Sequence, residues 1–161
     1  MPAALSRRSL FTALTGAVGS AVLAETFVAR PASATPGAAA SVQLVNPPFR
    51  ISDTRVDSPG VKLVGGHTLE VFVPGLIGEG VVGVMLNVTV TNTEGAGFLH
   101  VDASNATAAN GTSNINWWTT GLTLANLVAV PAEGTRGIVV TAGGTGKTDV
   151  AIDLVGFLTN P

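Results

Sequence analysis

The chain has no cysteine and no tyrosine, and only 11% of its 161 residues are charged. Without cysteine there is no disulfide, no thiolate metal site and no cysteine nucleophile. Aromatic residues make up only 5%, whereas glycine alone accounts for 20 positions. Small and β-branched residues dominate beyond residue 40, a mixture that favours many short strands joined by tight turns.

The first 34 residues differ in kind from the rest. Arg7 and Arg8 precede an uncharged run over residues 11–24, and Ala32-Ser33-Ala34 is a small-residue cleavage site. This order is typical of a signal peptide, and the paired arginines resemble the twin-arginine export signal. The apolar run is too short for a comfortable membrane span, although an uncleaved anchor is the alternative. We therefore predict export by a twin-arginine-type signal (1–34), an extracellular location and no membrane contact after cleavage.

Signal cleavage changes the charge balance. It removes three of the eight basic residues and one of the ten acidic residues, which leaves five against nine and a net charge of −4. No basic stripe remains to bind nucleic acid, so nucleic acid is not an expected partner. Electrostatic adhesion to an anionic membrane or wall polymer is also disfavoured.

The mature chain reads as a flexible N-terminal arm (35–41) followed by one domain (42–161). The arm is either a frayed terminus or a segment that lodges in a partner. Within the domain, Val81–Thr91 places a Val or Leu at every even position from 82 to 90, which is the period-two pattern of a half-buried strand. Other strand signals recur over 41–45, 68–73, 98–103, 114–119, 124–130, 137–141 and 149–158. About eight strands with no helical stripe predict an all-β, antiparallel β-sandwich or jelly roll. Pro47-Pro48 is expected to end the first strand.

The stretch TAGGTGKTD (141–149) resembles part of a phosphate-binding loop. The first glycine of that motif would fall on Thr141, and an alternating strand pattern follows where a helix is needed. We therefore predict that Gly143–Lys147 is a hairpin turn between the last two strands. No cofactor is expected.

Five short motifs occur in a familiar order. They are Asp53-Thr54-Arg55, Leu86–Thr91, Ser113–Trp117, Ala125–Pro131 and Asp149–Phe157. Together they resemble a small β-sandwich module of secreted actinobacterial proteins, in which these stretches read approximately LLDTR, LNVTVT, SNLNF, AN-V-VPV and IVDV-GYY. The resemblance covers about 42–158. It implies a non-catalytic domain, and some modules of this general kind look like adaptors of umbrella-type toxin particles. This chain departs from the pattern with Phe157 in place of a tyrosine and with an extra Trp118.

The most catalytic-looking cluster is His100, Asp102 and Ser104, which share one face of a strand. In a hydrolase triad, His lies between Ser and Asp and within about 3 Å of both. Here Asp102 lies between the other two, and same-face neighbours on a strand are about 6.5–7 Å apart. We therefore expect the solvent face of a strand and not a triad. His67 is expected in a turn, and two isolated histidines make no zinc site. The chain is predicted not to be an enzyme.

Trp117 and Trp118 are adjacent on a strand and must point to opposite faces. We expect Trp117 in the core and Trp118 as the candidate contact, with Asn114 and Asn116 beside them as further candidate binding residues. Exposed indoles stack on sugars or anchor protein interfaces, unless the 104–112 loop covers Trp118.

Asp53, Arg55, Asp149 and Asp153 come from opposite ends of the chain. The paired family motifs suggest a structural ion pair between Arg55 and Asp153 or Asp149 that ties the first strand to the last.

These observations predict a secreted, non-catalytic binding or adaptor module whose partner is another extracellular protein. Strand addition at an open sheet edge is an economical mode of binding for such a domain. The alternative is a module that binds cell-surface or cell-wall carbohydrate through Trp118. A hydrolase with a carboxylate pair assembled across strands is the least favoured interpretation.

Overall fold

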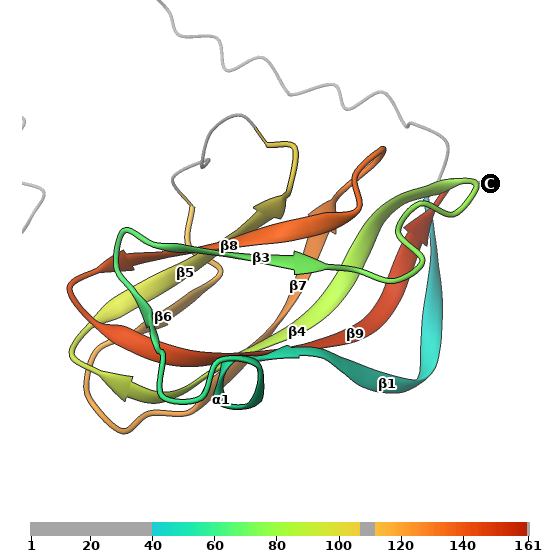
Figure 1. Cartoon of the computed structure of the whole chain (residues 1–161). Coiled ribbons are helices and arrows are strands. Elements are labelled where there is room, and N and C mark those ends of the chain that lie inside the picture. Colours follow the sequence, from blue (N-terminus) through green and yellow to red (C-terminus); the bar gives the residue numbers. More distant parts are fainter. Residues whose placement is uncertain (1–39, 107–111, 161) are drawn as a thin grey trace, which may run out of the picture. The chain divides into compact units, whose positions relative to one another are not determined.

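A computed structural model describes residues 40–106 and 112–160. The predicted signal peptide and most of the predicted arm lie outside these residues. The described chain is a sandwich of two open antiparallel sheets, which confirms the predicted all-β fold (Figure 1). Among the described residues, no helix is long and apolar enough to cross a membrane.

The first sheet has the strand order β1-β9-β4-β7. In addition, β2 pairs with the first two residues of β9. The second sheet has the order β3-β8-β5-β6. The strands are β1 (Ser41–Asp53), β2 (Leu63–Val64), β3 (Thr68–Phe72), β4 (Val81–Glu94), β5 (Gly97–Ala103), β6 (Ile115–Trp117), β7 (Leu124–Pro131), β8 (Gly137–Gly144) and β9 (Lys147–Thr159). A single helical turn, α1 (Thr54–Asp57), follows β1.

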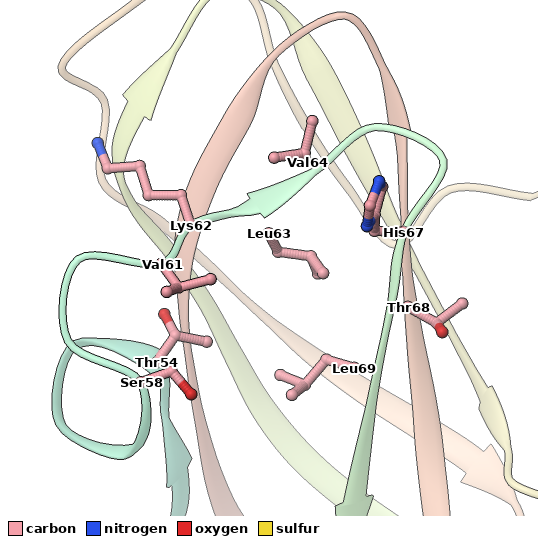
Figure 2. A pocket seen from close by; sticks show the side chains of 9 residues that line it. All are labelled: Thr54, Ser58, Val61, Lys62, Leu63, Val64, His67, Thr68 and Leu69. Carbon is pink, nitrogen blue, oxygen red and sulfur yellow. The ribbon is translucent and has the colours of Figure 1, made fainter.

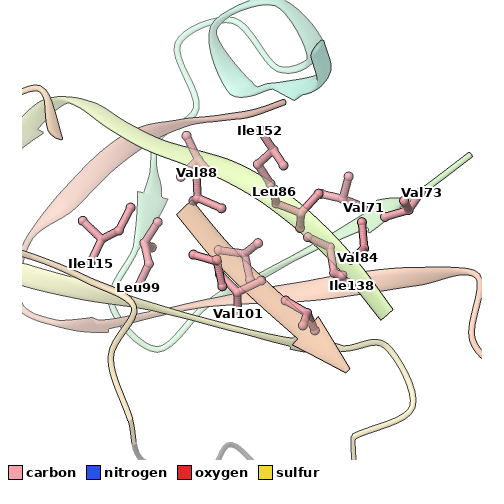
Figure 3. Packing of buried hydrophobic residues seen from close by; sticks show 14 of the residues in the cluster. Val71, Val73, Val84, Leu86, Val88, Leu99, Val101, Ile115, Ile138 and Ile152 are labelled. Atoms are coloured by element: carbon pink, nitrogen blue, oxygen red, sulfur yellow. The ribbon is translucent and has the colours of Figure 1, made fainter. Parts of the chain in front are cut away.

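The core lies between the facing sides of the two sheets. Val84, Leu86, Val88 and Val90 of β4 are each fully buried, as their alternation predicts. They meet buried residues of both sheets, including Leu99, Ile138 and Ile152 (Figure 3). Each fully buried Val, Leu or Ile contributes about 1.5–3 kcal/mol, so packing alone stabilises a domain without disulfides.

One expectation about a strand end is wrong. Pro47-Pro48 does not end the first strand, because β1 continues to Asp53 across a register shift between Leu44 and Phe49. β1 is an edge strand, where a missing proline N–H on the free side costs no ladder bond. The one-turn helix α1 was also not predicted, since four residues are too few to produce a helical stripe.

Four strands form one bent ribbon. β4 pairs with β9 in the first sheet, β5 pairs with β8 in the second, and both pairs are antiparallel. The chain passes from β4 to β5 and from β8 to β9 at the same corner, where Glu94 lies opposite Lys147 and Gly97 opposite Gly144. The predicted turn at 143–147 therefore exists, but it joins strands of different sheets and is not a hairpin.

Glycine is required where the ribbon bends. A Cβ on Gly146 would lie 2.7 Å from the carbonyl oxygens of both Glu94 and Ala96, and its N–H donates to Ala96 O at 2.8 Å. A Cβ on Gly65 would meet Gly144 O at 2.0 Å. Lys147, the lysine of the phosphate-loop-like stretch, pairs with Glu94 at 2.9 Å. The glycines of TAGGTGKTD thus allow two backbones to touch, and a strand follows them.

We expect Gly146→Ala to destabilise the domain by about 1–3 kcal/mol, because the added methyl overpacks two backbone carbonyls. Thermal or urea unfolding measures the loss. Thr145→Ala, at the exposed neighbouring position, is the matched control and should change stability little. Equal stability of Gly146→Ala and the native chain would contradict the close approach at this corner.

Candidate functional site

An arginine–aspartate network joins the first strand to the last. Arg50 lies directly opposite Asp153 in the β1–β9 register, and its Nε donates to Asp153 Oδ1 at 2.5 Å. Nη1 of the same guanidinium donates to Asp53 Oδ2, also at 2.5 Å. Arg50 therefore bridges the end of β1 and the middle of β9.

Arg55 does not make the pair that the motifs suggested. It closes a fork on Asp53, with Nε 2.8 Å from Oδ1 and Nη2 2.6 Å from Oδ2. Asp53 also caps α1, since Oδ1 accepts the backbone N–H of Arg55 at 3.1 Å. No ion pair links Arg55 to Asp153 or Asp149 in the described part of the chain, so that prediction is wrong. The first-to-last tie is made by Arg50.

Asp149 has a different structural role. Its carboxylate accepts Asn92 Nδ2 at 2.9 Å and Thr54 Oγ1 at 3.4 Å, and it is buried. Thr54 Oγ1 in turn accepts the N–H of Val150. Asp149 thus fixes the start of α1 against β9 and the end of β4. The pKa of Arg55 is raised mainly by its hydrogen bonds to Asp53, and the charge of Asp149 raises it further.

The hydrogen bonds from Arg55 lower the pKa of Asp53 from 3.8 to about 2, against the opposing effect of burial. A lowered pKa means that the ionised carboxylate stabilises the fold. That contribution is complete above the unfolded value and is lost as pH falls from about 4 to about 2.

We expect Asp53→Asn to cost about 2 kcal/mol of unfolding free energy at pH 7, because the neutral amide loses the charged fork from Arg55 and the single charged hydrogen bond from Arg50. The deficit should shrink as pH falls through the window from 4 to 2. Denaturant unfolding at a series of pH values measures it, with Glu79→Gln at an exposed position as the control. A deficit of equal size at pH 2 would contradict an electrostatic origin.

His100, Asp102 and Ser104 do not form a triad. His100 contacts Asp102 through Nε2 and the carbonyl of Thr112 through Nδ1. Ser104 Oγ instead bonds Thr135 Oγ1 at 2.5 Å. The expectation that this strand face is open to solvent is wrong at His100, which is only 5% exposed. Both imidazole nitrogens are occupied, so the ring is a structural link.

Trp117 is buried and Trp118 is 70% exposed, as predicted for neighbours on a strand. Trp117 packs on Gly97, where a Cβ would lie 2.4 Å from the indole. The sequence left open whether the 104–112 loop covers Trp118. Residues 107–111 of this loop lie outside the described residues. The binding role of Trp118 stays a prediction.

The two candidate asparagines differ. Asn114 is structural, since its Oδ1 accepts the N–H of Val101 at 2.7 Å and its N–H donates to Leu99 O at 2.8 Å. Asn116 is exposed, and its amide donates to Ser113 Oγ at 2.7 Å. Of the pair, Asn116 is the one that a ligand beside Trp118 could reach.

A hollow lies elsewhere, between α1, the 58–64 segment and the start of β3. It has a volume of about 180 Å³. Figure 2 shows Leu63 and Leu69 directed toward its centre. The complete lining is Thr54, Ser58, Val61, Lys62, Leu63, Val64, His67, Thr68 and Leu69. Sequence reasoning did not find this hollow, because the stretch 54–69 that lines it becomes concave only when the chain folds back between α1, β2 and β3.

The lining of the hollow is mixed, since four of its nine residues are aliphatic and five are polar. Val61 is 65% exposed and Val64 is 41% exposed. The amine of Lys62 points away from the hollow in Figure 2 and is held by Glu94 Oε1 at 2.8 Å and Asn92 O at 2.5 Å. The hollow is smaller than the roughly 300–1,000 Å³ of sites for drug-sized ligands, so it suits one apolar side chain and not a cofactor.

The lining of the hollow contains no carboxylate and a single histidine. His67 lies on its wall in Figure 2, with no carboxylate among the lining residues to orient the ring. Across the described residues, no group of three or more His, Asp or Glu side chains could hold a metal ion.

Comparisons with known proteins add no identity. No family profile and no curated protein sequence matches the chain. Among solved structures, a chain of the "Cyanophage Pam1 capsid asymmetric unit" aligns over 98% of this chain and 99% of its own length. Its sequence identity is 16% and its TM-score is 0.30, too low to carry an argument about fold or function.

Proposed function

We propose that this protein is a secreted, non-catalytic binding or adaptor module that engages another extracellular protein, as a subunit of a secreted complex. The observation that carries the proposal is the hollow beside α1, where four aliphatic side chains (Val61, Leu63, Val64 and Leu69) share the lining with five polar residues. Val61 and Val64 are exposed there. An open hollow of this size and polarity fits an apolar side chain presented by a partner protein. The signal-like N-terminus and the resemblance to secreted modules support the same proposal.

A second candidate is a carbohydrate-binding module. It is favoured by one specific observation, the 70% exposure of Trp118 beside the exposed Asn116. A flat indole at the surface stacks on sugar rings, and the amide supplies a hydrogen bond at its edge. The protein-binding proposal is preferred because the hollow is concave and also offers aliphatic side chains to a partner.

We expect Val61→Glu to weaken capture of the partner by at least tenfold (about 1.4 kcal/mol), because binding would bury an unpaired carboxylate. To measure this, tagged protein is added to culture medium of the producing organism and recovered through its tag. The partner recovered with it is quantified by mass spectrometry. Val56→Glu is the matched control, since Val56 is 73% exposed on α1 but does not line the hollow.

Two outcomes would contradict the protein-binding proposal. One is equal recovery of the partner by both variants. The other is retention of the protein on purified wall polysaccharide, abolished by Trp118→Ala, which would favour the carbohydrate-binding module.

We expect the exported protein to begin after Ala34, and intact-mass measurement of the secreted chain checks this. Arg7→Lys together with Arg8→Lys should greatly reduce export, because the twin-arginine pathway reads the arginine pair. Arg30→Lys, outside that pair, is the control. Undiminished export of the double variant would contradict a twin-arginine route.

A further inference from the structure

The strands at the sheet edges are unequally protected against pairing with another chain, and the shortest of them, β2, has only two residues. β1 carries Pro47, Pro48, the charged Arg50 and two register shifts. β3 is five residues long and contains Glu70, and β6 has only three residues. These are the devices by which natural sheets block their edges.

β7 has fewer of these devices, and the one proline that it carries, Pro131, is its last residue. It is eight residues long, pairs only with β4, and keeps an unshifted register from Leu124 to Pro131. Leu124–Val130 contains no proline, and the sequence from Ala103 to Ala132 contains no charged residue. A long, regular and uncharged edge is the kind that adds another strand.

The register shows which backbone groups are free. Ala132 donates its N–H to Val82 O at 3.0 Å, so the even-numbered residues of β7 bond to β4. The N–H and C=O groups of Ala125, Leu127 and Ala129 therefore face away from β4. No hydrogen bond satisfies them within residues 40–106 and 112–160. Pro131 has the same parity, and its missing N–H falls on this open side.

The free edge is complementary to itself. The same three residues place their side chains on the outer face, where all are exposed and Leu127 is 54% exposed. Along the strand, the large side chain of Leu127 lies between the small side chains of Ala125 and Ala129. An antiparallel copy centred there sets Leu127 against its equivalent and Ala125 against Ala129 of the other copy, with no charge on either side.

We propose that two copies of this chain pair antiparallel along β7, about a two-fold axis at Leu127, so that the first sheet continues from one copy into the other. Three reciprocal residue pairs exchange two bonds each, which gives about six backbone hydrogen bonds. The edge is free of charge, so a net-negative chain meets its copy there without opposing like charges. This pairing does not depend on the proposed function.

The first test is the mass of the purified protein in solution, by light scattering or sedimentation over a concentration series. The native chain is expected to form dimers. Leu127→Lys is expected to weaken them by at least tenfold, because two ammonium groups would oppose each other across the axis. Leu44→Lys is the matched control, since Leu44 is 66% exposed on β1, and this variant should dimerise like the native chain.

A second test does not depend on the lysine variant. The chain has no cysteine, so Leu127→Cys introduces a single thiol at the axis. Cα atoms of a hydrogen-bonded antiparallel pair are about 5.5 Å apart, which is within the range for a disulfide. Mild oxidation should convert this variant to a covalent dimer many-fold faster than Leu44→Cys.

The proposal is overturned by a native chain that stays monomeric at all concentrations measured. It is also overturned by a folded Leu127→Lys variant that dimerises normally, or by equal cross-linking of the two cysteine variants. Each result leaves the partner-binding test at Val61 unaffected, because Val61 does not lie on β7.

Discussion

The close approach of two glycine-containing turns at one corner is the constraint on which the rest of the structure depends. β4 and β9 are the central strands of the first sheet, and β5 and β8 are the central strands of the second. They form one antiparallel ribbon that bends where Gly146 packs on the carbonyls of Glu94 and Ala96. A side chain there would press on both carbonyls and strain the bend that sets the relative position of the two sheets. The facing valines and leucines form one core only because this bend brings them together.

The outer strands depend on local ties to the ribbon. β1 is held to β9 by backbone pairing and by Arg50, whose guanidinium joins Asp153 to Asp53. Asp53 then caps α1, and Asp149 fixes the first residue of the same turn through Thr54. Because α1 and the segment after it form one wall of the hollow, these carboxylates, already interpreted as structural from the sequence, position the surface that we propose for binding. Their chemistry is structural, and the apolar side chains beside them are the candidate contacts.

Local patterns in the sequence predicted most of the fold, and what they missed depends on register. Alternation placed β4 and its buried face correctly, and adjacency alone predicted one buried and one exposed tryptophan. Arg50 was not chosen as the partner of Asp153, because only the β1–β9 pairing shows that they lie opposite each other. The burial of His100 also has a non-local cause, since Thr112 comes back to contact it across the strand face. The hollow is built from the single stretch 54–69, and its concave shape depends on how that stretch folds back, which no local pattern indicates.

The two proposed surfaces are compatible because the fold separates them. In the first sheet β7 is at one edge, whereas β1, which leads into α1 and the wall of the hollow, is at the opposite edge. In the second sheet β3, which supplies Thr68 and Leu69 to the hollow, is likewise at the opposite edge from β6. A pair of chains joined along β7 therefore leaves both hollows open, and each dimer presents two equivalent sites to a partner. Two sites on one particle raise the effective concentration for a repetitive or multimeric partner, so that modest affinity at each hollow suffices for an adaptor.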